Sequence, residues 1–208
     1  IPIDKLQKYM DGDLDAEKEV ERFKKFGFYQ MRANVMVKEK EDPEPYYVGV
    51  YQYNENNGVY ICVAYQKEED FEYFNLLLKA LSLSGIGGKR SSGLGKFEIE
   101  VLECPSELKQ RMDTTKYKRW MSLSLSMPKE MEMESACVNA NYQLIKRSGF
   151  VSSNSYASEF QKKRSFFGFA AGSCICNKYE GDIYDVSMHG NHPVYKYAIP
   201  LFMGVSKK

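Results

Sequence analysis

The chain has 208 residues, 43% of them hydrophobic, which is enough for one or two domains with ordinary cores. A formal net charge of +1 disfavours a free-standing nucleic-acid binder but allows a subunit whose cations are clustered. The five cysteines are an odd number without a disulfide-dense pattern, and no apolar run resembles a membrane span or a secretory signal. We therefore expect a soluble cytoplasmic protein with no cofactor and no metal.

The first half of the chain predicts helices and strands in alternation. Helices are expected at residues 16–25 and 68–81, the second because apolar residues recur on one of its sides. The expected strands cover residues 31–37, 46–53, 59–65 and 97–103. A turn at Asn57-Gly58 should join the middle strands. The charged stretch 38–45, with two prolines, should be a protruding hairpin tip or a disordered loop.

The second half predicts further strands and little helix. Residues 108–118 are polar and are expected to form a connector. The strands that should follow cover residues 119–126, 142–146, 165–174 and 195–202. The fold class is therefore α+β with antiparallel sheets. Its predicted organisation is a first unit over 1–107, the connector over 108–118 and a second unit over 119–208.

The most informative segment is a glycine-rich loop between the second helix and the strand that follows it. Its thirteen residues, 85–97, hold five glycines, three cations and two hydroxyls. Glycine permits positive φ and close approach of another chain, and successive backbone N–H groups can form a concave anion nest. We expect the loop to bind phosphate through the following residues: Gly85, Gly87, Gly88, Lys89, Arg90, Ser91, Ser92, Gly93, Gly95 and Lys96.

Known nucleotide-binding loops do not match this segment. A P-loop requires Gly-Lys-Ser/Thr after the four-residue spacer, whereas Leu94 and Gly95 follow Gly93 here. A dinucleotide fingerprint that begins at Gly85 would need glycine in place of Arg90. Both motifs also run from strand to helix, and this loop runs from helix to strand. A mobile linker is the structural alternative, but a linker needs no Lys-Arg pair among its glycines.

The loop resembles the glycine-rich loop of the RAMP superfamily of CRISPR proteins. Gly-Gly-Lys-Arg-Ser-Ser-Gly at residues 87–93 is most similar to the family of subunits that cap the 5′ end of the guide RNA in type III-A (Csm-type) interference complexes. Weaker blocks agree in the same order along almost the whole chain. They are residues 1–4, 9–12, 32–37, 142–150, 171–173, 195–197 and 202–205.

This resemblance implies two RRM-like (ferredoxin-like) units and an RNA-binding subunit without catalytic residues. The loop would hold the 5′ tag of the guide RNA, and the neighbours would be the large signalling subunit and a backbone subunit, in antiviral defence. Family members begin with a further strand and helix, whereas this chain opens at Ile1. The first unit is therefore expected to lack its N-terminal strand and helix in this chain.

Other basic clusters lie beside aromatic residues. Cations gather at Lys116/Lys118/Arg119, Lys146/Arg147 and Lys162/Lys163/Arg164. The aromatic residues near them are Tyr117, Trp120, Phe150, Phe166 and Phe167. Such pairs suit stacking on unpaired bases, but residues in strand-like stretches usually belong to a core. We expect these aromatic residues to be core.

Other functions have weaker support. A RAMP-type metal-independent endoribonuclease would need a general base, and His189 is the candidate. Cys174, Cys176, His189 and His192 could supply zinc ligands, although neither pair has the usual zinc spacing. A third alternative is a protein-interaction module that makes no RNA contact.

Overall fold

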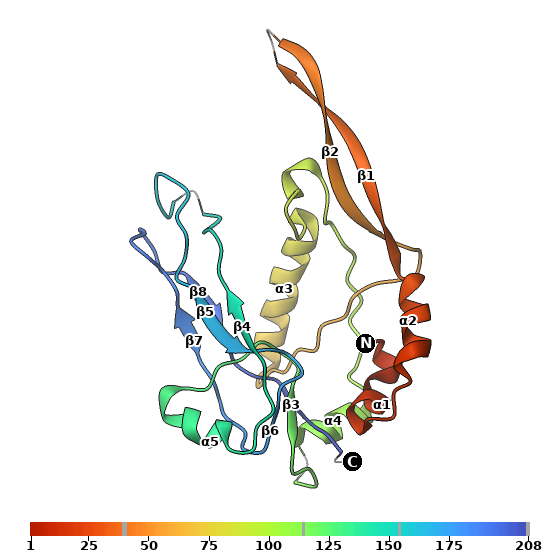
Figure 1. The fold of residues 1–208 in the computed structure, drawn as a ribbon, viewed down its shortest axis with the longest axis vertical. Coiled ribbons are helices and arrows are strands. Elements are labelled where there is room, and N and C mark those ends of the chain that lie inside the picture. Colours follow the sequence, from red (N-terminus) through yellow and green to blue (C-terminus); the bar gives the residue numbers. More distant parts are fainter. Residues whose placement is uncertain (39–40, 114, 154, 207–208) are drawn as a thin grey trace. The chain divides into compact units, whose positions relative to one another are not determined.

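The computed structural model describes residues 1–38, 41–113, 115–153 and 155–206 (Figure 1). The chain forms two compact units, Ile1–Cys62 and Val63–Lys208, which contain α-helices and antiparallel β-strands. The α+β class is confirmed, and the domain limits expected from the sequence stay a prediction. No helix among the described residues is long and apolar enough to span a membrane.

The first unit consists of short helices followed by one long hairpin. Its elements are η1 (Ile3–Lys5), α1 (Leu6–Asp11), α2 (Ala16–Lys24), β1 (Gly27–Lys38) and β2 (Glu41–Tyr53). The Asp15 carboxylate caps α2 by accepting from the Lys18 amide at 3.3 Å. β1 and β2 pair from Gly27 opposite Tyr53 to Lys38 opposite Glu41. This confirms the first helix and the hairpin strands, while residues 39–40 of the predicted tip lie outside the described residues.

The turn and the strand predicted after the hairpin are wrong. The chain turns at Glu55 and Asn56, where Asn56 has a φ of 60°, two residues before the predicted Asn57-Gly58 turn. Residues 59–65 and 97–103 form no strand, although both have suitable side chains. A β-strand exists only where another strand satisfies its backbone groups, and neither stretch pairs with one in the described chain. Composition alone therefore gave the wrong result at both places.

Two helices frame the glycine-rich loop in sequence. α3 (Glu68–Ser84) confirms the helix predicted at 68–81, and α4 (Ser106–Asp113) replaces much of the polar connector predicted at 108–118. The first residues of this stretch are thus helical, and its role as a connector stays a prediction. Leu108 and Arg111 are buried, and the Arg111 guanidinium donates to the Gly204 carbonyl oxygen at 3.1 Å.

The C-terminal part contains three small antiparallel sheets. β3 (Trp120–Ser122) lies between β6 (Cys174–Ile175) and β9 (Phe202–Gly204). β4 (Leu144–Arg147) pairs with β5 (Phe166–Phe169), and β7 (Ile183–Asp185) pairs with β8 (Tyr195–Tyr197). The remaining elements are η3 (Glu130–Glu132) and α5 (Met133–Cys137).

The long strands predicted here are shorter because the chain changes partners within them. The 165–174 stretch supplies β5 to one sheet and β6 to another, with a turn at Gly172, whose φ is 92°. The 195–202 stretch divides in the same way between β8 and β9. Two apolar clusters hold the sheets together. One contains Trp120, Ala136, Phe169, Ile175 and Tyr179, and the other contains Phe166, Val186 and Ala198.

Glu132 joins η3 to the segment that precedes β7. Its carboxylate accepts hydrogen bonds from the backbone amides of Lys129 at 2.8 Å, Glu180 at 2.9 Å and Gly181 at 3.2 Å. Partial burial works to raise the pKa of this carboxyl, but the three amide bonds outweigh it and hold the pKa below the usual 4.5. The ionised carboxylate therefore stabilises the fold.

We predict that Glu132→Gln lowers both the melting temperature and the free energy of unfolding at neutral pH. The loss of free energy should be on the order of 1 kcal/mol, because the amide offers one acceptor oxygen in place of two. A carboxyl whose pKa is lowered on folding stabilises the folded protein at pH values above its ordinary pKa of 4.5. It loses this effect as the pH falls through the lower pKa of the folded state. Thermal unfolding across this range should show the difference from wild type vanish in acid. Glu134→Gln, an exposed neighbour, serves as control, and equal effects of the two variants would contradict the prediction.

Candidate nucleic-acid interface

The base of the glycine-rich loop is a narrow neck. Gly85 ends α3 with a φ of 81°, and its amide donates to the Leu81 carbonyl oxygen at 2.7 Å. The next amide, that of Ile86, donates to the Gly95 carbonyl oxygen at 2.9 Å and closes the loop. A Cβ atom at Gly95 would lie 1.9 Å from the Ile86 oxygen, and one at Gly85 would lie 2.8 Å from the Leu94 oxygen. Glycine at these two predicted site positions is therefore explained by the close backbone contact of the neck.

The tip of the loop folds on its own backbone. Residues Arg90–Ser92 form the single 3₁₀ turn η2. The amides of Ser92 and Leu94 donate to the Lys89 carbonyl oxygen at 3.1 and 3.3 Å, and the Gly93 amide donates to that of Arg90 at 2.9 Å. Gly87 and Gly93 have positive φ values of 108° and 79°. Their conformation explains glycine at these two positions, since any other residue there is strained.

Gly88 differs from the other loop glycines. Its φ lies outside the positive range, and a Cβ atom built on it would meet nothing within 4 Å. Neither backbone strain nor packing within the described chain explains a glycine here. Close approach of a ligand is the remaining steric reason for the absence of a side chain.

Several amides at the tip are available to a ligand. Those of Gly87, Gly88, Arg90 and Ser91 donate no hydrogen bond to another described residue, and all four residues are exposed. Adjacent free N–H groups in a tight turn form a concave site with a partial positive charge. This arrangement suits an oxygen of a phosphate group.

The charged side chains of the loop are positive, like the partial charge of its amide N–H groups. Lys89, Arg90 and Lys96 are exposed, and within the described chain neither Arg90 nor Lys96 has a carboxylate partner within 4.0 Å. Ser91 and Ser92, also exposed, add hydroxyl groups that can donate or accept. The structure thus brings all ten predicted residues into one closed loop, where they divide into a neck and a tip.

The aromatic residues beside the basic clusters fall into two groups. Trp120 and Phe166 are core side chains, 7% and 8% exposed. Phe150 and Phe167 are 54% and 51% exposed, and a lysine ammonium lies over each ring. The expectation that these residues are core is therefore wrong for Phe150 and Phe167, because Phe167 alternates with the buried Phe166 on β5 and Phe150 lies in an isolated bridge with Lys162.

The histidine and cysteine candidates do not form one site. His192 uses both ring nitrogens, with Ser153 Oγ at 2.8 Å and the Pro193 carbonyl oxygen at 2.9 Å. His189 is exposed, in a left-handed conformation with a φ of 50°. Among the described residues no group of three or more Cys, His, Asp or Glu side chains is placed to hold a metal ion. Cys174 and Cys176 instead lie near backbone carbonyls.

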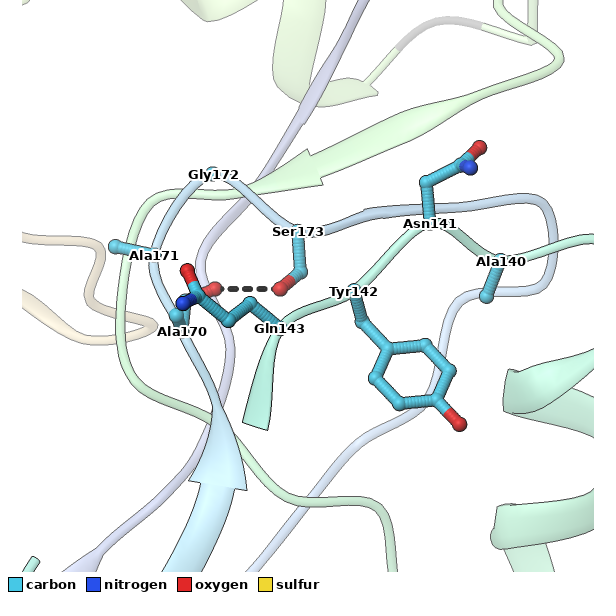
Figure 2. A pocket seen from close by; sticks show the side chains of 8 residues that line it. All are labelled: Ala140, Asn141, Tyr142, Gln143, Ala170, Ala171, Gly172 and Ser173. Atoms are coloured by element: carbon cyan, nitrogen blue, oxygen red, sulfur yellow. Dashed lines mark hydrogen bonds between the residues drawn. The ribbon is translucent and has the colours of Figure 1, made fainter. Parts of the chain in front are cut away.

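A surface pocket of about 470 Å³ lies elsewhere in the C-terminal part (Figure 2). Residues 140–143 and 170–173 line it, so two of the sequence blocks that resemble the RAMP family meet there. The Ser173 hydroxyl donates to the Ala170 carbonyl oxygen at 2.7 Å and fixes one wall (Figure 2). No charged side chain lines the pocket, so it is a poorer phosphate site than the loop.

Two protein-family models match the sequence. The RAMP superfamily model matches residues 10–98, and the model of the CRISPR Csm4 C-terminal domain matches residues 115–205. The glycine-rich loop lies within the first match. The two matches together cover most of the chain and agree with the family resemblance.

Curated relatives give the same result. The CRISPR system Cms protein Csm4 of Mycobacterium tuberculosis is 36% identical over 206 residues, 99% of this chain and 66% of that protein. The protein of the same name from Streptococcus thermophilus is 33% identical over 163 residues, 78% of this chain and 52% of that protein. The chain thus spans less than two thirds of the length of these relatives.

A solved structure supports the fold. A chain in the crystal structure of a Csm3-Csm4 subcomplex of the type III-A CRISPR-Cas interference complex matches with a TM-score of 0.53 and 17% sequence identity. The match covers 99% of this chain and 72% of that one. At this identity the likeness concerns the fold alone.

Proposed function

The chain belongs to the Csm4 family of the RAMP superfamily, and we propose that it is a non-catalytic RNA-binding subunit of a type III-A CRISPR effector complex. The glycine-rich loop holds the 5′ tag of the guide RNA. The observation that carries this proposal is the set of unpartnered, exposed amides at Gly87, Gly88, Arg90 and Ser91. A phosphodiester supplies the oxygens that such a nest lacks.

Each part of the loop has its own role in this proposal. The neck glycines, Gly85 and Gly95, hold the tip closed. The tip amides and the cations of Lys89, Arg90 and Lys96 bind phosphate oxygens. The hydroxyl groups of Ser91 and Ser92 bind a phosphate or a ribose 2′-hydroxyl, which distinguishes RNA from DNA.

The partners follow from the same family. We propose that the subunit lies between the large signalling subunit and a backbone subunit, in the cytoplasm, and that its parts are RRM-like units. The solved structure that resembles this chain is a complex of Csm3 with Csm4, which supports a neighbour of the backbone type.

A guide-processing endoribonuclease is the competing function. His189 is exposed and its ring donates to and accepts from no described residue, so it is sterically free to act as a base. We predict no cleavage, because no acid is paired with it in the described chain. Repeat RNA incubated with the protein in EDTA should remain intact. Cutting that disappears in His189→Ala would establish the endoribonuclease.

We predict that Lys89→Ala/Arg90→Ala weakens binding of RNA that carries the tag. Each phosphate that is no longer neutralised should reduce the slope of log affinity against log salt by about 0.7 for a single strand. Binding isotherms at several salt concentrations measure both quantities. The matched control is Lys18→Ala/Lys24→Ala, which removes two cations that pair with Asp15 and Glu21 in α2. Equal slopes in wild type and the loop variant would remove the loop from the proposal.

We predict that Gly88→Val abolishes RNA retention and leaves the melting temperature nearly unchanged. The valine side chain meets open space in the free protein but obstructs a phosphate that approaches the tip amides. A substitution in solvated backbone changes stability by no more than about 0.5 kcal/mol. Guide-RNA retention on purified complexes and thermal unfolding provide the two measurements. Gly58→Val, also in open space but outside the loop, is the control, and normal retention by Gly88→Val would contradict the nest.

A further inference from the structure

We propose that the outward face of the β4–β5 pair is a second contact surface for single-stranded RNA, on which exposed phenylalanine rings stack with unpaired bases. The residues that form it are Lys146, Phe150, Phe160, Lys162 and Phe167, and we call it the ring face. It shares no residue with the glycine-rich loop and rests on separate observations.

The register of β4 and β5, which lie side by side in Figure 1, separates their side chains onto two faces. Lys146 lies opposite Phe167, so these two side chains share one face. Arg147 lies opposite Phe166 on the other face, where Phe166 is buried in an apolar cluster. The face of Lys146 and Phe167 is therefore the one turned away from this cluster.

The same pairing continues beyond the end of β4. Phe150 forms an isolated bridge with Lys162, and the next amide, that of Val151, donates to the Gln161 carbonyl oxygen at 2.9 Å. Phe150 follows Lys146 by four positions, and alternation along an extended segment puts both on the same face. Two pairs of a lysine and a phenylalanine thus lie along one face.

Three rings on this face are open to solvent. Phe167 and Phe150 are 51% and 54% exposed, and Phe160 is 86% exposed. The ring centroids of Phe150 and Phe160 are 6.4 Å apart, with the ring planes at 84°, so these two rings form an edge-to-face pair. A group of exposed rings, unlike a single one, marks a binding surface.

Two of the rings have a lysine beside them. The Lys146 ammonium lies 5.8 Å from the centroid of Phe167, and that of Lys162 lies 5.5 Å from the centroid of Phe150. Both distances are near the limit of a cation–π contact, about 6 Å, so each lysine can turn to a phosphate when a base covers the ring. Within the described chain no carboxylate lies within 4.0 Å of either ammonium group.

This combination favours a nucleic acid over an apolar protein. An apolar protein surface that covered the rings would also remove water from two ammonium groups without offering them a negative partner. A strand of RNA satisfies both kinds of group, because its bases stack on the rings while its phosphates neutralise the lysines. The faces of bases are accessible only where the bases are unpaired, so the RNA is single-stranded.

The test measures the affinity of the complete protein for fluorescein-labelled oligouridine by anisotropy over a range of salt concentrations. Phe167→Ala should weaken binding by about 5- to 150-fold with little change in the salt slope, because a ring is lost and no charge. Phe167→Leu, which keeps apolar volume without a flat ring, should also weaken binding, and Phe167→Trp should bind as wild type does. Lys146→Ala/Lys162→Ala should instead reduce the salt slope, by about 0.7 for each phosphate left without a cation.

Two control variants remove the same kinds of group elsewhere. Tyr73→Ala removes a ring that is 64% exposed on α3, and Lys18→Ala/Lys24→Ala removes two cations of α2. Neither control should change the affinity or the salt slope. Repeating the Phe167 substitutions in the Lys89→Ala/Arg90→Ala background removes the contribution of the loop cations, and the loss of affinity should persist there.

Each outcome separates the ring face from the loop. If Phe167→Ala and Phe167→Leu bind oligouridine as wild type does, the ring face is wrong, whatever the loop does. If they lose RNA and Lys89→Ala/Arg90→Ala does not, the ring face stands and the loop proposal fails. If double-stranded RNA depends on Phe167 as strongly as oligouridine does, stacking is excluded and the proposal is overturned. If the Phe167 variants keep RNA but no longer assemble with other subunits, the face binds a protein and the RNA assignment is overturned.

Discussion

The neck of the glycine-rich loop is the constraint on which the candidate site depends. The Ile86 amide and the Gly95 carbonyl oxygen are 2.9 Å apart, and this approach leaves no room for a Cβ atom at Gly95 or at Gly85, which precedes Ile86. The tip residues 86–93 are exposed, and the tip satisfies part of its backbone within η2. The remaining amides must face solvent or a ligand. Binding capacity therefore arises from a steric condition at the base of the loop.

The charge distribution explains how a protein of net charge +1 can have strongly basic surfaces. Several acids of the first unit are paired with cations of the same region, as in Lys18 with Asp15 and Arg22 with Asp4, both within 3.2 Å. Such exposed pairs contribute little to stability, but each removes a cation and an anion from the long-range field. Arg90 and Lys96 of the loop have no such carboxylate partner among the described residues. Net charge is thus a poor guide to the local surface charge of a protein whose acids and cations lie in different regions.

Local patterns in the sequence were sufficient for two helices and the loop, and insufficient for the other helices and the sheets. α2 has its Asp15 cap and α3 its apolar side within a few turns of chain, so both could be predicted. Residues 59–65 have a strand-like sequence and no strand beside them in the described chain, which no local pattern reveals. The helix α4 was not predicted, because its burial depends on a hydrogen bond from Arg111 to the Gly204 carbonyl oxygen, ninety-three positions away.

The same distinction applies to the candidate sites. The loop glycines were visible as a motif, but their division into neck and tip required Cβ distances. Lys146 and Phe167 are far apart in the sequence, and only the register of β4 and β5 places one beside the other. The signal that could have separated Phe167 from its buried neighbour Phe166 was strand alternation, which puts successive side chains on opposite faces.

The chemistry of the glycine-rich loop limits the task that it can perform. From Gly85 to Lys96 the loop has no aromatic side chain, so it can hold phosphates and ribose but offers no ring on which a base can stack. Exposed rings occur instead in the C-terminal part, where Phe167 lies beside Lys146 and Phe150 beside Lys162. An amide nest fixes the position of one phosphate within a few tenths of an ångström, because hydrogen bonds are short and directional. Stacking and point charges tolerate sliding along a strand. The loop is thus suited to fix one end of an RNA rather than to follow a strand along its length.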